Sequence, residues 1–310
     1  MRISYSAPAK IILSGEHASV YGKPTLITSI NLRLTITIFR KMVIQKDKVM
    51  KMISGIVISY LKKNKINYQP HNYGFEIKSE IPVGANLGSS AALSVASVAA
   101  FLEFYTGKEF DKEIINSLAY EVEKFFHGTP SGGDNSTSCF GGLIYFRKEF
   151  DFLKSISKLP IKFPESFSKY LFIIDSGKPK ETTKEMNMMV RKLYTNNPKK
   201  LQVVFFSIEE ITKTMVLSIQ NNDIPSFKAS ILKNQKELEQ LKVVSEKTKA
   251  LLTQLNKYGA GKVTGAGGSV QGSGNVLFFS NSNQQTKLFL EKNKIDYLPF
   301  VTDSAGLIKI

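Results

Sequence analysis

Residues able to bind phosphate, hold a cation or move a proton gather in three segments that lie far apart in the chain. The first is "PVGANLGSSAA" (82–92), where glycines and two serines stand directly before an apolar run. Glycine permits close backbone approach, and a helix start offers unpaired N–H groups with a partial positive charge. Such a loop can cradle a phosphate, or it can be an ordinary turn between a strand and a helix. The segment alone leaves both readings open.

The second segment, "EVEKFFHGTPSGGDNSTSCFGG" (121–142), holds two acids that the chain could bring into one site. Asp134 stands among glycines and small polar residues, where a carboxylate can approach a ligand without crowding. Glu123 lies toward the end of the preceding helix, and the turn after that helix could bring the two acids together. Two carboxylates with a serine suit Mg²⁺, a hard cation that takes oxygen ligands. The alternative is an Asp-Asn turn and a surface glutamate.

The third segment, "SAPAKIILSGEHASVYG" (6–22), carries one charge inside an otherwise alternating strand. That residue is Lys10, and if it points inward it needs an anionic partner. Glu16 and His17 follow in the next loop. Three histidines and one cysteine do not form a zinc-binding set. The chain also lacks the G-x-S-x-G, G-x-x-x-x-G-K-[ST] and G-x-G-x-x-G motifs, so serine-hydrolase, P-loop and dinucleotide-binding functions lose their main support.

The composition predicts a soluble globular protein of one large or two smaller domains. Of 310 residues, 42% are apolar and 22% are charged, and the net charge is +16. The excess is scattered lysine, which is typical of a solvated surface, although a basic chain also favours anionic partners. Arginine clusters and an aromatic–basic stacking pattern are absent, which disfavours nucleic acid. The lone Cys139, the lack of a signal peptide and the short uncharged run 91–102 predict a cytoplasmic protein away from membranes.

Hydrophobic periodicity predicts a mixed α+β protein in two halves, divided near residue 160. Strands are expected within 1–40, in "NYGFEIKSEI", "GLIYF", "KYLFIID" and the apolar run after the last glycine loop, and in the closing "YLPFV" and "GLIKI". The predicted helices are 45–63, about 89–105, about 111–126, roughly 182–194, 199–220, 223–240 and 243–257, and near 283–293. The segment 127–142 is dense in turn formers and is expected to be a loop.

Four motifs taken together resemble the GHMP kinase family of small-molecule kinases. They are "PAKIILSGEHASVYG" (8–22), "PVGANLGSSAA" (82–92), "HGTPSGGDNSTSCFGG" (127–142) and "KVTGAGG" (262–268). The GEHA-x-VYG form of the first motif is similar to that of the members that phosphorylate mevalonate. The resemblance implies an α+β, two-domain GHMP kinase fold. Residues 1–160 would form an N-terminal domain like domain 2 of ribosomal protein S5, and residues 161–310 a ferredoxin-like α/β sandwich.

The resemblance also implies roles for individual residues. Asp134 would be the general base toward the substrate hydroxyl, and Lys10 would pair with it and steady the transferring phosphoryl group. Mg²⁺ would be held by Ser90 and Glu123. The residues expected to bind ATP are Pro82, Gly84, Ala85, Asn86, Leu87, Gly88, Ser89, Ser90, Ala91, Gly265, Ala266 and Gly267. Those expected to contact the substrate are Glu16, His17, Val20, Asp134 and Thr183, with Thr182 left open as the alternative to Thr183.

The implied reaction is Mg²⁺-dependent transfer of a phosphoryl group from ATP to mevalonate in isoprenoid biosynthesis, by a cytoplasmic enzyme that is a homodimer in many relatives. The alternatives are phosphomevalonate kinase, a sugar kinase, a basic nucleic-acid-binding protein, and a family member that has lost catalysis. One departure stands out. The family continues TGAGG with small residues, whereas "TGAGGSVQGSGNV" inserts the bulkier Ser269, Val270 and Gln271, so an altered loop is expected there.

Overall fold

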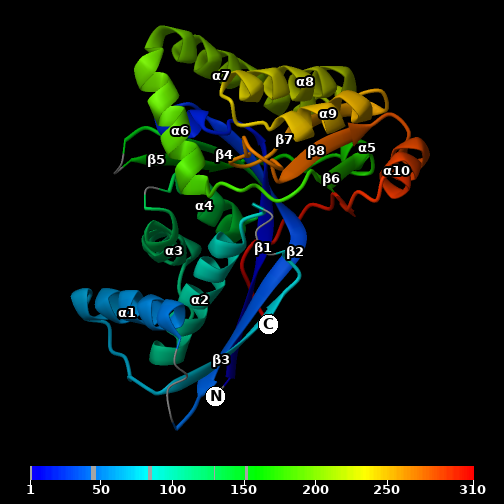
Figure 1. The fold of residues 1–310 in the computed structure, drawn as a ribbon. Coiled ribbons are helices and arrows are strands. Elements are labelled where there is room, and N and C mark those ends of the chain that lie inside the picture. Colours follow the sequence, from blue (N-terminus) through cyan, green and yellow to red (C-terminus); the bar gives the residue numbers. More distant parts are fainter. Residues whose placement is uncertain (1, 43–46, 83–85, 129, 151–152) are drawn as a thin grey trace.

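The computed structural model describes residues 2–42, 47–82, 86–128, 130–150 and 153–310. Its strands form two sheets, and helices cover both of them (Figure 1). The first sheet runs β10-β1-β2-β4-β5, with β3 also pairing with β2, and the second runs β7-β8-β6-β9. The predicted α+β class is confirmed.

The element boundaries are as follows. The strands are β1 (Arg2–Ser14), β2 (Thr25–Arg40), β3 (Tyr73–Ser79), β4 (Leu143–Lys148), β5 (Lys154–Lys158), β6 (Leu171–Asp175), β7 (Gly259–Val263), β8 (Asn275–Ser280), β9 (Tyr297–Pro299) and β10 (Ile308–Lys309). The helices are α1 (Lys48–Lys63), α2 (Ser89–Thr106), α3 (Lys112–His127), α4 (Gly133–Phe140), α5 (Glu165–Ser168), α6 (Thr183–Asn196), α7 (Pro198–Gln220), α8 (Ile224–Gln240), α9 (Glu246–Leu255) and α10 (Asn283–Lys292), and a short 3₁₀ helix spans Ala18–Tyr21.

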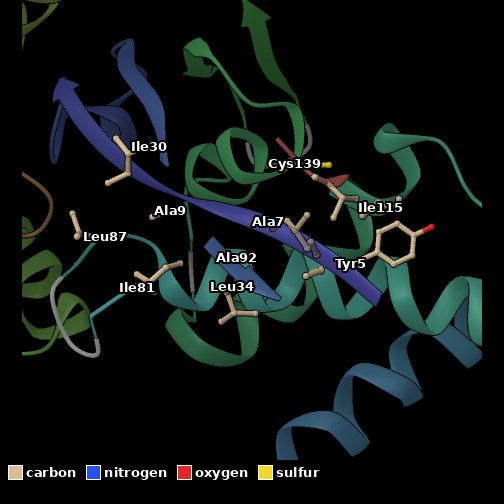
Figure 2. Close-up of a cluster of buried hydrophobic side chains, with 14 of the residues drawn as sticks. Tyr5, Ala7, Ala9, Ile30, Leu34, Ile81, Leu87, Ala92, Ile115 and Cys139 are labelled. Carbon is tan, nitrogen blue, oxygen red and sulfur yellow. The ribbon is translucent and has the colours of Figure 1, made fainter. Parts of the chain in front are cut away.

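The helix α2 forms the centre of the first half. It is apolar on all sides because it packs between the sheet and its neighbours α1, α3 and α4. By length and composition α2 could cross a membrane, but 78% of it is buried inside the fold, as in the core helix of a globular domain. Figure 2 shows Ala7 and Ala9 of β1 in the same buried cluster as Ala92 of α2, the helix that packs against this strand. These small residues let the helix approach the strand closely.

In the second half, α8 and α9 pack against β7 of the four-stranded sheet, and α7 packs along α8 and also contacts β1 and β2 of the first sheet (Figure 1). A group of aromatic rings fills the junction between its elements, with Phe167 stacking edge-on against both Phe227 and Phe279. The chain then returns to the first sheet, because Thr302 bridges to Ile30 and β10 pairs with β1. The division into domains at residue 160 stays a prediction.

The expectation of a loop over residues 127–142 was wrong, because residues 133–140 form the helix α4. Serine and threonine are poor helix formers in isolation, since their side chains compete for backbone groups. Here the Ser136 and Thr137 hydroxyls bond to carbonyls four residues back, inside the same helix. A second stabilising contact joins α4 to α3, where Asn116 donates to Ser136 and accepts from Asn135. Tertiary contacts therefore outweigh the local turn signal.

The strand β7 was not predicted separately, because its sequence "GAGKV" contains two glycines. Glycine is ordinarily unfavourable in a strand. At Gly259 it is required, since a Cβ there would lie 2.0 Å from the carbonyl oxygen of Phe279 on the neighbouring β8. The glycine that weakens the local signal is thus what permits the pairing of the two strands.

Candidate active site

A pocket of about 280 Å³ lies where the two halves meet. Its walls come from β1 and the following loop, the segment before α2, the end of α3, the start of α4, the start of α6 and the loop after β7. The sequence-predicted residues that line it are Lys10, Glu16, His17, Val20, Pro82, Asn86, Leu87, Gly88, Ser89, Ser90, Glu123, Asp134, Thr183, Gly265 and Ala266. Segments that are distant in sequence therefore meet in one cavity.

Two of the predicted residues that the structure describes, Ala91 and Gly267, are not among those that line this pocket. Ala91 is fully buried within the core. Gly267 packs against the backbone of Val243, where an added Cβ would lie 2.1 Å from the carbonyl oxygen. Gly84 and Ala85 lie outside the described residues. Of the two threonines left open, Thr183 lines the pocket, whereas the Thr182 hydroxyl caps α6 by accepting from the Glu185 N–H.

Lys10 and Asp134 meet on one wall of the pocket. The Lys10 Nζ lies 3.1 Å from the Asp134 Oδ2, and the lysine side chain is 4% exposed while the aspartate side chain is 38% exposed. β1 supplies the lysine from the middle of a buried strand, and the first turn of α4 supplies the acid. The buried cation thus has the anionic partner that its position demands. The acid keeps part of its surface open to a ligand.

The loop before α2 is built around Lys10. The Lys10 backbone N–H donates to the Leu87 carbonyl at 2.9 Å. Gly88, the residue that precedes α2, adopts φ +80°, and a Cβ there would lie 2.8 Å from Lys10 Cγ. A side chain at this position would therefore be strained and would collide with the lysine stem. The glycine lets the loop, the lysine and the first N–H groups of α2 share one small space.

Ser90 and Glu123 place oxygen atoms side by side at the end of α3. The Ser90 hydroxyl donates to Glu123 Oε2 at 3.3 Å, and Ser94 donates to Oε1 at 2.9 Å. The His127 Nε2 lies 3.0 Å from Ser90 Oγ and 3.5 Å from Glu123 Oε2. Burial, followed by repulsion from Asp134, raises the pKa of the Glu123 carboxyl to about 7. This carboxyl therefore lies in a place where a nearby cation would stabilise its ionised form.

This oxygen pair fits Mg²⁺. No group of three His, Cys, Asp or Glu residues suited to a metal occurs in the described part of the chain. Mg²⁺ does not require one, because it commonly binds through one or two protein oxygens and completes its shell with water and nucleotide phosphates. Ser90 and Glu123 provide such a partial set, next to the start of α2.

The loop after β1 is held by residues of the second half. Glu16 is buried and forms an ion pair with Lys262 of β7. The His17 Nε2 lies 3.0 Å from the Ala266 carbonyl and donates to it, and Asn187 of α6 also hydrogen-bonds the imidazole. Burial lowers the pKa of His17, so the ring is neutral. The predicted substrate contact of His17 stays a prediction, and its visible partners are protein groups.

Comparison with known proteins places the chain among kinases. A family model described as the GHMP kinases N terminal domain matches residues 49–142. Over 85% of this chain and 88% of the relative, the sequence is 32% identical to a curated mevalonate kinase from Archaeoglobus fulgidus. The chain belongs to the GHMP kinase family. A mevalonate kinase from Pyrococcus furiosus is 28% identical over 98% of this chain and 96% of its own.

Solved structures agree with the GHMP kinase fold. The mevalonate kinase of Methanococcus jannaschii superposes with a TM-score of 0.76 at 24% identity, covering 98% of each chain. The L. major mevalonate kinase in complex with R-mevalonate has a TM-score of 0.76 at 21% identity, covering 97% of this chain and 96% of that one. At these identities the superpositions establish the shared fold.

Sequence reasoning missed several residues around this kinase site. Lys262, Asn187 and Ser94 were assigned no role, although each bonds a predicted site residue. Lys262 is a charge inside a buried strand, the feature that singled out Lys10, but the two glycines of β7 kept that strand from being predicted. For Asn187 and Ser94 no local signal exists, because a polar residue on a helix is ordinarily a surface residue.

The unusual insertion after the TGAGG motif points away from the pocket. Both the backbone N–H and the hydroxyl of Ser269 donate to Glu181, and Val270 is 62% exposed. Gly265 and Ala266 of the same loop still line the pocket. The bulkier residues are thus accommodated on the outer side of the loop.

Proposed function

We propose that this GHMP kinase transfers the γ-phosphoryl group of ATP to the primary hydroxyl of mevalonate, giving 5-phosphomevalonate and ADP for isoprenoid biosynthesis. The chain-long similarity to curated mevalonate kinases supports this substrate. The observation that carries the chemistry is the 3.1 Å contact between Lys10 and Asp134 in the pocket beside the glycine loop.

In this reaction Asp134 accepts the proton of the substrate hydroxyl as the oxygen attacks phosphorus. Its partly exposed carboxylate faces the cavity, so an alcohol can approach within hydrogen-bond distance. The ammonium of Lys10 offsets negative charge that builds up between the attacking oxygen and the phosphoryl group. Phosphoryl transfer requires little covalent chemistry from a protein, so this positioning accounts for most of the expected catalysis.

The first turn of α2 binds the phosphates of ATP. Its N-terminal N–H groups, near Ser89 and Ser90, are unpaired within the helix and carry a partial positive charge. Ser90 and Glu123 would hold Mg²⁺, which when bound neutralises charge on the phosphate oxygens. Asn86, Gly265 and the remaining lining residues of the two glycine loops enclose the nucleotide from both halves of the molecule.

The charge of the pocket favours mevalonate over an already phosphorylated acceptor. Of the described residues that line it, Lys10 is the one lysine and none is arginine, and Lys10 already faces Asp134. A substrate phosphate would call for further cations. A phosphomevalonate kinase from Streptococcus pneumoniae shares the fold, with a TM-score of 0.76 at 17% identity, and covers the whole of both chains. The fold alone therefore does not choose between these substrates.

An assay of ADP release, coupled to NADH oxidation, tests the proposal. Purified protein is given ATP, Mg²⁺ and one acceptor at a time: mevalonate, phosphomevalonate or galactose. We expect turnover with mevalonate that exceeds turnover with the other two. Preference for another acceptor, or no turnover with mevalonate at any pH between about 6 and 9, would refute the assignment. The cytoplasmic location, the homodimer and the absence of nucleic-acid or membrane partners stay predictions.

A further inference from the structure

Two lysines and two acids are arranged as two separate ion pairs around the site. Lys10 pairs with Asp134 on the pocket wall, and Lys262 pairs with Glu16 behind it. Both side chains of the second pair are 0% exposed, and they join β7 of the second sheet to the loop after β1. Lys262 is not among the residues that line the pocket, whereas Glu16 is.

Stability does not explain why a fully buried ion pair is present here. Burying two charges costs free energy that their attraction repays only in part, and apolar replacements of such pairs are often more stable. One oxygen of the pair is also left over, because Glu16 Oε2 has no hydrogen-bond partner among the described residues. The arrangement is therefore better explained by what it does for the neighbouring site.

Lys10 is the other cation that acts on Glu16. Burial raises the pKa of the Glu16 carboxyl, and the charges of both Lys262 and Lys10 oppose that change. Glu16 lines the same pocket as Lys10 and Asp134, so a turn of its carboxylate would make it a competitor of Asp134 for the Lys10 ammonium. A fully buried Glu16 carboxylate that loses Lys262 has either to gain a proton or to reach another cation, and Lys10 is the lysine that lines the same pocket.

We propose that Lys262 is a positioning residue that holds the Glu16 carboxylate away from Lys10. Lys10 then stays paired with Asp134 and can act on the transferring phosphoryl group. This inference rests on the proposed kinase function, in which Lys10 acts at the reacting atoms. Lys262 itself touches neither substrate. It acts by giving the buried acid a partner of its own.

The backbone around the pair is held mainly by groups other than Lys262, whose Nζ adds one long hydrogen bond of 3.4 Å to the Ile12 carbonyl. Thr264, two residues further along, donates its hydroxyl to the Ile12 carbonyl at 2.9 Å and accepts from the Ile12 N–H at 3.1 Å. β7 is also bonded along its length to β8. Replacing Lys262 should therefore leave β1 and β7 in place, because the Ile12 carbonyl keeps its shorter bond from Thr264, and free the carboxylate of Glu16 to turn.

The test compares Lys262→Met, Glu16→Gln and the double variant with wild type. In Lys262→Met the unpaired carboxylate takes Lys10, so kcat for mevalonate falls by roughly 10- to 100-fold, as for other small displacements of catalytic groups, while the KM for ATP stays within about 3-fold. In the double variant the competing charge is gone, and kcat returns to within about 3-fold of that of Glu16→Gln alone. Wild-type kcat in Lys262→Met, or a double variant as slow as Lys262→Met, would overturn the inference.

Lys23→Met is the matched control. Lys23 forms another mostly buried ion pair between the halves, 2.8 Å from Glu209 of α7, and it does not line the pocket. Loss of that pair should lower the melting temperature without lowering kcat. If Lys23→Met and Lys262→Met lose kcat equally, the effect is general loosening of the molecule and the proposal is wrong.

Two further measurements keep the inference falsifiable. If Lys262→Met does not fold, Lys262→Leu removes both the charge and the donor with a different apolar shape, and wild-type kcat in that variant overturns the proposal. A crystal structure of whichever variant folds should show the Glu16 carboxylate within hydrogen-bond distance of the Lys10 Nζ. An unmoved Glu16 refutes the inference even if wild type turns out to phosphorylate another acceptor, so failure of the inference and failure of the proposed function can be told apart.

Discussion

Protonation of Glu123 should be visible in the stability of the metal-free enzyme. The side chain is 2% exposed, and its pKa of about 7 in the folded protein compares with an ordinary value of 4.5. The folded state therefore binds this proton more tightly than the unfolded chain does. The resulting stabilisation is fully present below about pH 4.5 and is lost as the pH rises through about 7.

The size of the effect follows from these two values. The difference between 7 and 4.5 corresponds to roughly 3 kcal/mol, at about 1.4 kcal/mol per pH unit. Roughly 2 kcal/mol of this falls between about pH 5 and pH 7, because the unfolded carboxyl is already largely ionised at pH 5. Glu123→Gln removes the ionisation and keeps an oxygen that can accept from Ser94. The free energy of unfolding of the variant should therefore rise by roughly 2 kcal/mol relative to wild type across this range.

Urea unfolding in the presence of EDTA, at about pH 5, 6 and 7, measures this difference. Titrating groups remote from position 123 cancel, so the difference reports Glu123 together with its neighbour His127, whose Nε2 lies 3.5 Å from Glu123 Oε2. Glu121→Gln is the control, because Glu121 is an exposed acid on the same helix, paired with Lys124. Equal pH dependence of wild type and Glu123→Gln would refute the reasoning. It would mean that the buried carboxylate has a compensating cation after all.

Three further predictions concern the site and the core. Asp134→Asn and Lys10→Met should each lower kcat by at least ~10²-fold, because both residues are proposed to act at the acceptor side. Calorimetry should show that both variants largely retain ATP binding. Wild-type turnover in either variant would contradict these roles. Gly88→Ala should weaken ATP binding more than mevalonate binding and also slow turnover, since its Cβ would meet Lys10 at 2.8 Å; equal weakening of both ligands would indicate a simple turn. Phe227→Ala, at 0% exposure among other aromatic rings, should cost about 3–5 kcal/mol in urea unfolding and leave the KM values unchanged.

Local sequence signals were sufficient for the long helices. The pattern predicted a helix at about 89–105, and α2 spans Ser89–Thr106, between Gly88 and Gly107. The helix predicted at 199–220 is α7, which begins at Pro198. In both cases the periodicity and the residues at the ends are properties of one short segment. Local patterns did not predict α4 and β7, because the stability of these elements comes from partners elsewhere in the chain. The contacts of Asn116 and Gly259 show this.

The site was predicted in a different way from the helices. The sequence alone marked Lys10 as a buried charge in need of an anion, and it placed Asp134 in a loop where a carboxylate could meet a ligand. That these two should meet came from the family resemblance, because no local rule connects a residue of the first strand with one beyond the third helix. The structure brings them to 3.1 Å from one another.

The same buried-charge argument, applied to Lys262, would have called for a second acid without naming it. Each of the two lysines could neutralise either of the two acids, so the sequence alone does not decide which lysine pairs with which acid. Burial decides it in the structure. The pair that excludes water is Lys262 with Glu16, whose side chains are both 0% exposed, whereas Lys10 pairs with the acid that remains 38% exposed. In the observed pairing the acid with the larger exposed fraction, Asp134, is the one beside Lys10, and this is the arrangement that the proposed phosphoryl transfer needs.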